Sequence, residues 1–223
     1  DSNLIGSWNV LELAKRVKPN HLLLASTSSI YGANPKIPFE ETDKADEPLS
    51  LYAATKKGME AMAHAYAHLY QLPTTTFRFF TVYGPWGRPD MAIFMFTKAI
   101  VEGTPIRLFN HGRMRRDFTY IGDVTRVVSH LVDHAPGEGA GAPARIYNVG
   151  NNHPEELTHV VAVLERELGR AAVREMLPMQ PGDVTETFAD VAELMRDTGF
   201  RPQTSIEDGL RAFVAWYRDY HRI

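Results

Sequence analysis

Cysteine is absent from all 223 residues of the chain. This absence excludes disulfide bonds and thiolate metal sites, and it makes the cytoplasm the default location. Excess basic charge is also missing, because 24 basic and 27 acidic residues give a formal net charge of −3 without a long run of either sign. Phosphate binding usually leaves a basic footprint, so no nucleic-acid partner is expected. No apolar stretch approaches the ~18 residues that a membrane span needs, so no membrane partner is expected.

Motifs of hydrolases and metalloenzymes are missing as well. No G-x-S-x-G segment is present, which leaves a serine hydrolase without support. His64 and His68 lie four residues apart in an expected helix, but Ala65 stands where a zinc protease carries glutamate. A second pair, His130 and His134, has the same spacing. A solvated helix face explains both pairs better than a metal site, so we expect no bound metal.

Short apolar or β-branched runs alternate along the chain with segments of helical spacing. The wholly apolar run 22–25 predicts a strand that is buried on both faces. From Pro154 onward the pattern is mostly helical, and residues 33–48 read as a loop. Such alternation predicts an α/β fold with a parallel sheet. The expected helices cover residues 4–17, 51–70 (capped by Ser50), 91–101, 124–132 and 206–220, and the expected strands cover residues 22–25, 74–82, 106–109, 117–121 and 145–149.

Two clusters of reactive side chains stand out in this pattern. The segment S-T-S-S-I-Y-G, residues 26–32, places hydroxyls directly after the first strand, at the sheet edge where open α/β sheets bind ligands. The segment Y-A-A-T-K places Tyr52 four residues before Lys56, so both side chains lie on one face of a helix.

A tyrosine with its ordinary pKa near ~10 is a poor base at neutral pH, and lowering that pKa by roughly three units takes about 4 kcal/mol. A lysine ammonium one helical turn away supplies part of this stabilisation, and a cationic cofactor ring supplies more. A hydroxyl at the strand end relays a proton between substrate and phenolate. The two clusters therefore predict removal of an alcohol proton, the companion step of hydride transfer.

The two clusters, in this order and spacing, resemble the extended short-chain dehydrogenase/reductase family, which contains the nucleotide-sugar epimerases and dehydratases. Three further stretches narrow the resemblance to the UDP-glucuronate 4-epimerases, and the similarity covers essentially the whole chain. These stretches are F-R-F-F-T-V-Y-G-P-W-G-R-P-D-M-A at 77–92, N-H-G-R-M-R-R-D-F-T-Y-I-G-D-V at 110–124 and P-M-Q-P-G-D-V at 178–184.

The resemblance implies part of a doubly wound, Rossmann-type parallel sheet with a smaller mixed α/β substrate-binding domain. Residues 1–84 and 115–150 are expected to belong to the NAD-binding domain, and residues 85–114 and 151–223 to the nucleotide-sugar-binding domain. The family's G-x-x-G-x-x-G turn is not in the sequence. At about 30 residues per βαβ unit, roughly a hundred residues of the nucleotide-binding half are missing, so we expect a C-terminal fragment that is inactive alone and does not bind NAD tightly.

The resemblance also implies the catalytic roles. Tyr52 corresponds to the base that takes the proton from the sugar O4 as hydride leaves C4 for NAD. Lys56 corresponds to its electrostatic partner and a ligand of the nicotinamide ribose, and Thr27 to the hydroxyl that bridges substrate and tyrosine. Asn3 and Phe80 resemble residues that line the cofactor.

Substrate-binding roles follow from the same resemblance. Arg116 resembles the arginine that grips the UDP phosphates, a task that suits its guanidinium geometry. Asp183 matches a contact to the nucleotide ribose. Gln180 stands where galactose epimerases place a second phosphate-binding arginine, and Thr81 stands where many relatives carry asparagine.

The strand-end residues favour epimerisation over related reactions. After the threonine, the dehydratases carry an acidic pair (T-D-E) and the uronate decarboxylases carry serine and glutamate (T-S-E). This chain has Ser28 and Ser29 there, with no carboxylate. Oxidation of a uronic acid at C4 makes a β-keto acid, which loses carbon dioxide unless its carboxylate is held. Hydroxyls of Ser28, Ser29 and Thr81 can hold that group without repelling it, and Arg88 helps to fix the sugar.

The expected activity is NAD-dependent interconversion of UDP-glucuronate and UDP-galacturonate through a 4-keto intermediate. Three alternatives stay open: another nucleotide-sugar epimerase, a UDP-glucuronate decarboxylase, or a non-catalytic remnant that binds a sugar nucleotide. The expected partners are a UDP-sugar and a second copy of the chain, because in this family the helices at 3–17 and 51–70 form a homodimeric four-helix bundle.

Overall fold

The computed structural model describes residues 1–137, 141–179 and 185–223, and its contacts divide the chain into two units. The first unit comprises Asp1–Phe80, Arg126–Val149 and Ala189–Arg201. The second comprises Thr81–Thr125, Gly150–Phe188 and Pro202–Ile223. The predicted NAD-binding and nucleotide-sugar-binding domains follow from the family resemblance and not from contacts, and they remain a prediction.

The first unit is built on a parallel sheet with the strand order β1-β2-β6. Its strands are β1 Leu22–Thr27, β2 Thr74–Phe79 and β6 Ala144–Val149. Ser26 pairs with Arg78, and Arg78 pairs with Asn148. Because the strands are parallel, their carboxyl ends meet at one edge, which is where the sequence places its hydroxyl cluster. This unit confirms the predicted α/β class with parallel strands.

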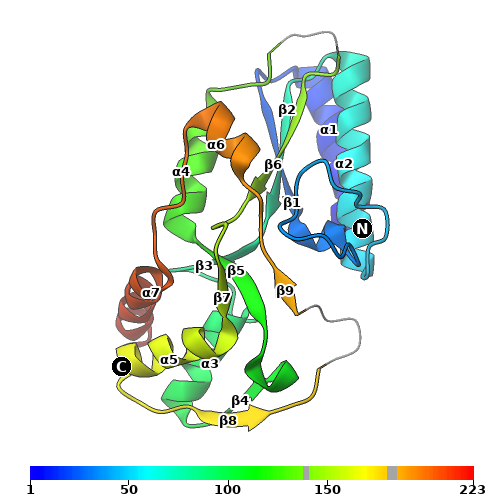
Figure 1. The fold of residues 1–223 in the computed structure, drawn as a ribbon. Coiled ribbons are helices and arrows are strands. Elements are labelled where there is room, and N and C mark those ends of the chain that lie inside the picture. The colour runs from blue at the N-terminus through cyan, green and yellow to red at the C-terminus, as the bar shows by residue number, and fades with distance from the viewer. Residues whose placement is uncertain (138–140, 180–184) are drawn as a thin grey trace. The chain divides into compact units, whose positions relative to one another are not determined.

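Helices cover both faces of this sheet (Figure 1). On one face, a π-helical turn (Ser2–Gly6) leads into α1 Ser7–Val17, which packs beside α2 Leu51–Tyr70. On the other face lie α6 Ala192–Thr198 and residues 126–132 of α4 Ile121–Val132. No helix of the described residues combines the length and apolarity needed to cross a bilayer.

Strand β1 corrects one expectation. It was predicted to be buried on both faces, but its leucines are only half-buried and Ala25 is exposed. Only its last residues, Ser26 and Thr27, are buried. Within the described chain β1 is the edge strand of its sheet, since it pairs with β2 alone. Side chains on an edge strand have neighbouring strands on one side only, and this explains the exposure.

The expected single strand at 74–82 is a second correction. Strand β2 ends at Phe79, and β3 Thr81–Tyr83 belongs to a sheet of the second unit. At the break, the Phe80 N–H donates to the Val149 carbonyl at 3.1 Å, and the Phe80 ring packs beside Phe39 in an apolar cluster. Residues on both sides of Phe80 are β-branched or aromatic, so the residue pattern of 74–82 gives no signal that the chain changes sheets there.

The second unit contains β5 Arg115–Tyr120 at the centre of a mixed sheet. Strand β5 pairs with β3 and β9 Glu186–Thr187 in parallel, and with β7 Pro154–Glu156 in antiparallel orientation. A separate parallel pair joins β4 Pro105–Leu108 to β8 Val173–Met176. The helices α3 Ala92–Glu102, α5 Leu157–Leu168 and α7 Ile206–His221 supply most of the core, which includes Ile100, Leu164, Leu210 and Phe213.

The region after Pro154 is less helical than predicted. Helices α5, α6 and α7 lie there, but β7, β8 and β9 are short strands of three, four and two residues. Each pairs with a strand at least 30 residues earlier in the chain. Segments this short carry no period of their own, so only their distant partners define them as strands.

Candidate active site

The hydroxyl cluster lies at the carboxyl end of β1. Thr27 is extended and caps the short 3₁₀ helix Ser28–Tyr31, because its Oγ1 accepts from the Ser29 N–H at 3.2 Å. The same Oγ1 donates to Ser29 Oγ at 3.1 Å. Thr27 is buried, Ser28 half-buried and Ser29 exposed, so the cluster runs from the interior of the unit to its surface.

Helix α2 carries the tyrosine and the lysine. Ser50 caps the helix, as predicted, by accepting from the Ala53 N–H at 3.1 Å. Tyr52 therefore lies in the first turn, and its side chain is 48% exposed. Lys56 Nζ donates to the Ala25 carbonyl oxygen of β1 at 3.0 Å. The ammonium is thus fixed beside the strand that ends in Thr27.

Asn3 reaches the same helix from the N-terminal π-helical turn. Its Nδ2 donates to Thr55 Oγ1 at 3.2 Å, and Thr55 Oγ1 donates to the Tyr52 carbonyl oxygen at 2.7 Å. Asn3, Thr55 and Tyr52 therefore form a short chain of hydrogen bonds around the first turns of α2. Thr55 was not among the predicted site residues, although its hydroxyl connects Asn3 and Tyr52, which were.

A buried polar network lies beneath the hydroxyl cluster. Arg78 of β2 donates to Glu60 Oε1 at 3.1 Å through Nε and to Glu60 Oε2 at 2.9 Å through its terminal nitrogen. Arg78 also donates to Tyr31 Oη at 2.9 Å, and Tyr31 donates to Asn148 Oδ1 at 2.6 Å. Burial raises the pKa of Tyr31 to about 12, against the opposing effect of the Arg78 guanidinium. Tyr31 is therefore a neutral donor rather than a second base.

Glu41 borders this network from the loop after the 3₁₀ helix. Its Oε1 accepts from the Asn148 N–H at 2.8 Å, and its carbonyl oxygen accepts from Arg78 at 2.9 Å. Burial raises the pKa of the Glu41 carboxyl, although the Asn148 N–H partly offsets that effect.

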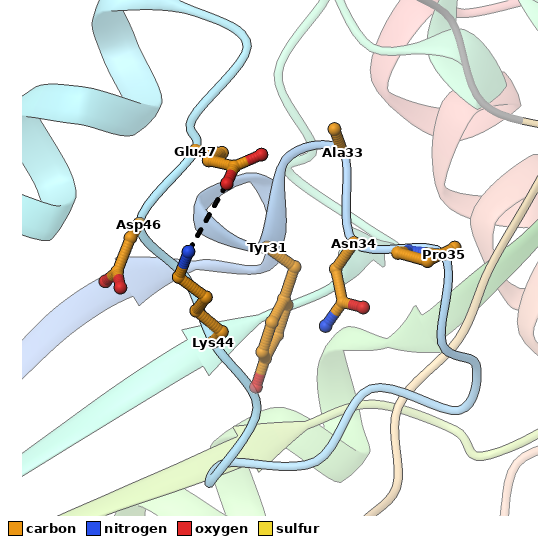
Figure 2. Close-up of a pocket in the computed structure, with 7 residues that line it drawn as sticks. All are labelled: Tyr31, Ala33, Asn34, Pro35, Lys44, Asp46 and Glu47. Carbon is orange, nitrogen blue, oxygen red and sulfur yellow. Dashed lines mark hydrogen bonds and ion pairs between the residues drawn. The ribbon is translucent and has the colours of Figure 1, made fainter.

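A small pocket of about 140 Å³ opens beside Tyr31 (Figure 2). Figure 2 shows the Tyr31 ring between the segments of the loop that line the pocket, and it marks the ion pair of Lys44 with Glu47. The Lys44 Nζ to Glu47 Oε1 distance is 3.3 Å. Gly32 has φ +56°, and a Cβ there would overlap the Glu47 carbonyl oxygen. The glycine therefore lets the chain turn away from the 3₁₀ helix and close this loop.

Phe80 is the last predicted site residue of the first unit. Its ring is buried in the apolar cluster described above. Thr81, Arg88 and Arg116 belong to the second unit. Arg88 forms a bidentate ion pair with Asp90, with contacts of 3.0 and 2.5 Å, and this pairing lowers the pKa of Asp90. Arg116 lies on β5 and donates to the Arg115 carbonyl at 3.0 Å.

Gln180 and Asp183, the two predicted nucleotide contacts near the C-terminal end, lie outside the described residues. Within the first unit, the structure brings the Tyr52 and Lys56 helix against the strand that ends in Thr27. Chemically, this arrangement combines a partly exposed phenol, a fixed ammonium and a strand-end hydroxyl, which suits proton removal from a bound alcohol.

Glu60 was also missed by the sequence analysis. It lies eight residues after Tyr52 and four after Lys56, so the helical period that grouped the first two residues includes it as well. Ser26, which donates to Glu60 at 2.6 Å, had been noted only as one of the hydroxyl residues.

Known proteins are similar in sequence to this chain over all or nearly all of its length. A "Probable UDP-glucuronate 4-epimerase" from Rhizobium meliloti is 55% identical, over 100% of this chain and 69% of the relative. "UDP-glucuronate 4-epimerase 4" from Arabidopsis thaliana is 46% identical, over 99% of this chain and 53% of the relative.

Solved structures are similar in fold as well. The UDP-glucuronic acid 4-epimerase from Bacillus cereus, in complex with UDP-glucuronic acid and NAD, superposes with a TM-score of 0.87 at 30% identity, over 98% of this chain and 68% of that one. MoeE5 in complex with UDP-glucuronic acid and NAD gives a TM-score of 0.88 at 30% identity, over 98% of this chain and 71% of that one. A sequence model for the NAD dependent epimerase/dehydratase family matches residues 1–150. The strand-end hydroxyls, the Tyr52 and Lys56 helix, the parallel sheet and these similarities agree, and the chain belongs to the NAD dependent epimerase/dehydratase family.

Proposed function

We propose that the protein interconverts UDP-glucuronate and UDP-galacturonate by NAD-dependent epimerisation at C4. The observation that carries the proposal is the attachment of Lys56 to the end of β1, which places the helix of Tyr52 beside the strand of Thr27. The relatives named as UDP-glucuronate 4-epimerases support the choice of sugar.

In this proposal Tyr52 removes the proton of the sugar O4 hydroxyl and later returns a proton to O4, while the configuration at C4 inverts because the hydride comes back to the opposite face of the ketone. Lys56 stabilises the phenolate, and the Thr27 hydroxyl relays the proton between sugar and tyrosine. Thr27 Oγ1 donates to Ser29 Oγ, so it can turn its hydrogen toward an incoming oxygen at the cost of one exposed hydrogen bond. A positioned acid or base of this kind contributes about 10²–10⁴-fold to a rate.

The residues of the first unit fit the ribose end of NAD. An ammonium has three donors, and the bond to Ala25 O uses one, which leaves donors of Lys56 for ribose hydroxyls. Asn3, half-buried at the start of the chain, presents an amide close to the same helix. Phe80, which is buried in the cluster with Phe39, is proposed as an apolar contact of the cofactor. When bound, NAD supplies an acceptor for the C4 hydride and gives the hydride back.

The absence of acid at the strand end supports epimerisation over decarboxylation. Ser28 and Ser29 offer neutral hydroxyls to a uronate carboxylate, whereas a glutamate in their place would repel it. At 4 Å and an effective dielectric of about 20, two like charges repel by roughly 4 kcal/mol. A held carboxylate keeps the β-keto acid from losing carbon dioxide.

For the second unit we propose substrate contacts at Thr81, Arg88 and Arg116. Arg88 already pairs with the Asp90 carboxylate in a bidentate geometry, which is the geometry that a uronate carboxylate accepts. Arg116 is proposed to bind a phosphate of UDP, with Gln180 and Asp183 as further contacts to the nucleotide. The division into an NAD-binding part (1–84 and 115–150) and a sugar-nucleotide-binding part (85–114 and 151–223) belongs to the same proposal.

A homodimer through α1 and α2 completes the proposal. Leu13 and Val17 of α1 are 59% and 66% exposed, and Leu69 of α2 is 66% exposed. Ala61 and Ala65 are exposed on α2 as well, and small side chains let two helices approach closely. Apolar side chains at this density on two adjacent helices favour burial against a second copy.

The direct test is incubation of the full-length, NAD-loaded protein with UDP-glucuronate, followed by separation of the sugar nucleotides. We expect a mixture of UDP-glucuronate and UDP-galacturonate that is the same from either starting sugar. Formation of UDP-xylose alone would identify a decarboxylase instead. Binding of UDP-glucuronate without any conversion would support the non-catalytic alternative.

A further inference from the structure

Glu60 continues the catalytic face of α2 into the protein interior. Tyr52, Lys56 and Glu60 are spaced by four residues, so their side chains lie along one face of the helix. Along this face exposure falls from 48% at Tyr52 to 4% at Glu60. The mechanism proposed above uses the first two residues and leaves the buried carboxylate without a role.

One carboxylate joins α2 to two strands of the sheet. Glu60 Oε1 accepts from Ser26 Oγ of β1 at 2.6 Å and from Arg78 Nε of β2 at 3.1 Å, and its Oε2 accepts from Arg78 at 2.9 Å. Ser26 and Arg78 are partners in the sheet register, so the carboxylate spans neighbouring strands at a single level. Lys57 lies further out, with Nζ 3.8 Å from Oε2.

The position of these contacts matters more than their number. Lys56 holds the carbonyl of Ala25, and Glu60 holds the hydroxyl of Ser26, which is the next residue of the strand. Two consecutive turns of α2 therefore form hydrogen bonds to two consecutive residues of β1, and Thr27 is the next residue of that strand. The offset of the Tyr52 helix along the Thr27 strand is fixed by these two bonds.

Stability alone does not explain a buried ion pair at this place. Removing two charges from water carries a large desolvation penalty, and apolar residues of similar volume often stabilise a protein as well or better. A directional, charge-assisted contact differs from apolar packing in fixing one relative placement of the elements that it joins.

We propose that Glu60 is a positioning residue for the epimerisation, a role that rests on the function proposed above. By binding Ser26 and Arg78 together, it sets the distance of the Tyr52 phenol from the sugar hydroxyl that Thr27 also contacts. Its loss shifts the base relative to its substrate and leaves the binding of the UDP moiety unchanged.

The test compares a charge-free replacement with variants that separate positioning from stability. In Glu60→Met/Arg78→Met both charges are removed and the volume is kept, but Ser26, Tyr31 and the Glu41 carbonyl each lose a hydrogen-bond partner. The melting temperature is therefore measured as well, and turnover is compared well below it. A misplacement near 1 Å costs about 10²-fold, so we expect kcat to fall about 10²-fold with KM for the nucleotide sugar within about twofold. A crystal structure of the variant should show a changed distance from Lys56 Nζ to Ala25 O.

Ser26→Ala keeps the ion pair and removes only the link to β1, so it tests the same idea if the double variant fails to fold. We expect an intermediate loss of kcat, about tenfold, with KM unchanged. Leu131→Ala, in the buried part of α4 in the same unit, is the matched control: it should lower the melting temperature and leave kcat unchanged below the transition.

Full turnover in the charge-free variant, or in Ser26→Ala, would overturn the proposal and leave Glu60 a structural residue. All rates are measured on the full-length, NAD-loaded protein and compared with the wild type on whichever nucleotide sugar the wild type converts. If the wild type does not epimerise UDP-glucuronate, the proposed substrate is wrong, and the comparison of variants still decides the role of Glu60.

Discussion

At the scale of single residues, the groups at the candidate active site already have partners inside the protein. The Lys56 ammonium is held by the Ala25 carbonyl, and the Thr27 hydroxyl exchanges two hydrogen bonds with Ser29. Tyr52 is half exposed in the first turn of its helix. The lysine and threonine groups are held in place, whereas the phenol is accessible. A base that must reach a substrate arriving from solvent needs such an accessible group beside fixed ones.

Replacing Tyr52 by phenylalanine tests its role as the base. The ring remains, so we expect the affinity for UDP-glucuronate to stay nearly constant while the rate falls by about 10²–10⁴-fold, the usual contribution of a positioned base. Turnover under saturating substrate and calorimetric binding measure the two effects separately. A variant that keeps more than about a tenth of the wild-type rate would point to another base.

Glu41 gives a prediction about pH. Burial raises the pKa of its carboxyl in the folded protein above the value in the unfolded chain. An acid with a raised folded pKa binds its proton more tightly when folded, so ionisation destabilises the fold as the pH rises through the unfolded and then the folded value. Glu41→Gln keeps an acceptor for the Asn148 N–H and removes this cost. We expect the variant to be more stable than the wild type at pH 7 and equal to it at low pH, where the Glu41 carboxyl is protonated in both states.

Urea unfolding of Glu41→Gln at pH 7 and near pH 3 measures this difference. Glu47→Gln is the control, because Glu47 lies at the surface in an exposed ion pair with Lys44, and such pairs contribute little. An equal effect of Glu41→Gln at both pH values would show that ionisation of Glu41 is not the cause.

At the scale of elements, α2 connects local sequence chemistry to the site. Its cap at Ser50 fixes where the helix begins, and Tyr52 follows two residues later. Ala53, Ala63 and Ala67 are buried, which lets the helix lie close to the sheet, and Lys56 and Glu60 then reach β1. Because Tyr52 lies in the first turn, a change in where the helix begins would displace Tyr52 more than Lys56 or Glu60.

Loss of the cap should therefore weaken the start of α2. Ser50→Ala leaves the Ala53 N–H without its partner, and we expect a loss of about 1 kcal/mol in the free energy of unfolding. Ser50→Gly keeps that N–H accessible to water and should cost only a few tenths of a kcal/mol. Denaturant unfolding of both variants checks the order, and equal losses would contradict a capping role.

At the scale of the whole molecule, each unit is assembled from three separate segments of the chain. The first unit combines the hydroxyl cluster, Tyr52 and Lys56, and the second contains Thr81, Arg88 and Arg116. Because each unit combines segments that are far apart in the sequence, a substituted residue contacts residues from distant segments of the chain. The apolar surface of α1 and α2 adds a further level, since we propose that a second copy covers it.

Leu13→Glu tests this assembly. A charge at a 59% exposed leucine costs nothing in a monomer but must be buried in the proposed dimer, so we expect the variant to run as a monomer. Light scattering after size exclusion gives the mass. Met95→Glu, on α3 of the second unit and 48% exposed, is the control and should not change the mass. A dimeric Leu13→Glu variant would place the interface elsewhere.

Local chemistry in the sequence determined a large part of this protein. Serine at position 50 and the following apolar spacing predicted α2, and the alternation of runs predicted parallel strands, because caps and periods act over a few residues. The spacing of Tyr52 and Lys56 placed them on one helix face for the same reason. The fold class and these two predictions are confirmed, while the catalytic roles remain proposals.

Only the tertiary structure decided which distant groups meet. That Lys56 binds Ala25, that Glu60 binds both Ser26 and Arg78, and that the chain changes sheets at Phe80 depend on pairings between segments far apart in the chain. The short strands β7, β8 and β9 have the same origin. Local propensity acts within a few residues, whereas strand pairing and the burial of an ion pair are set by partners that no local pattern identifies.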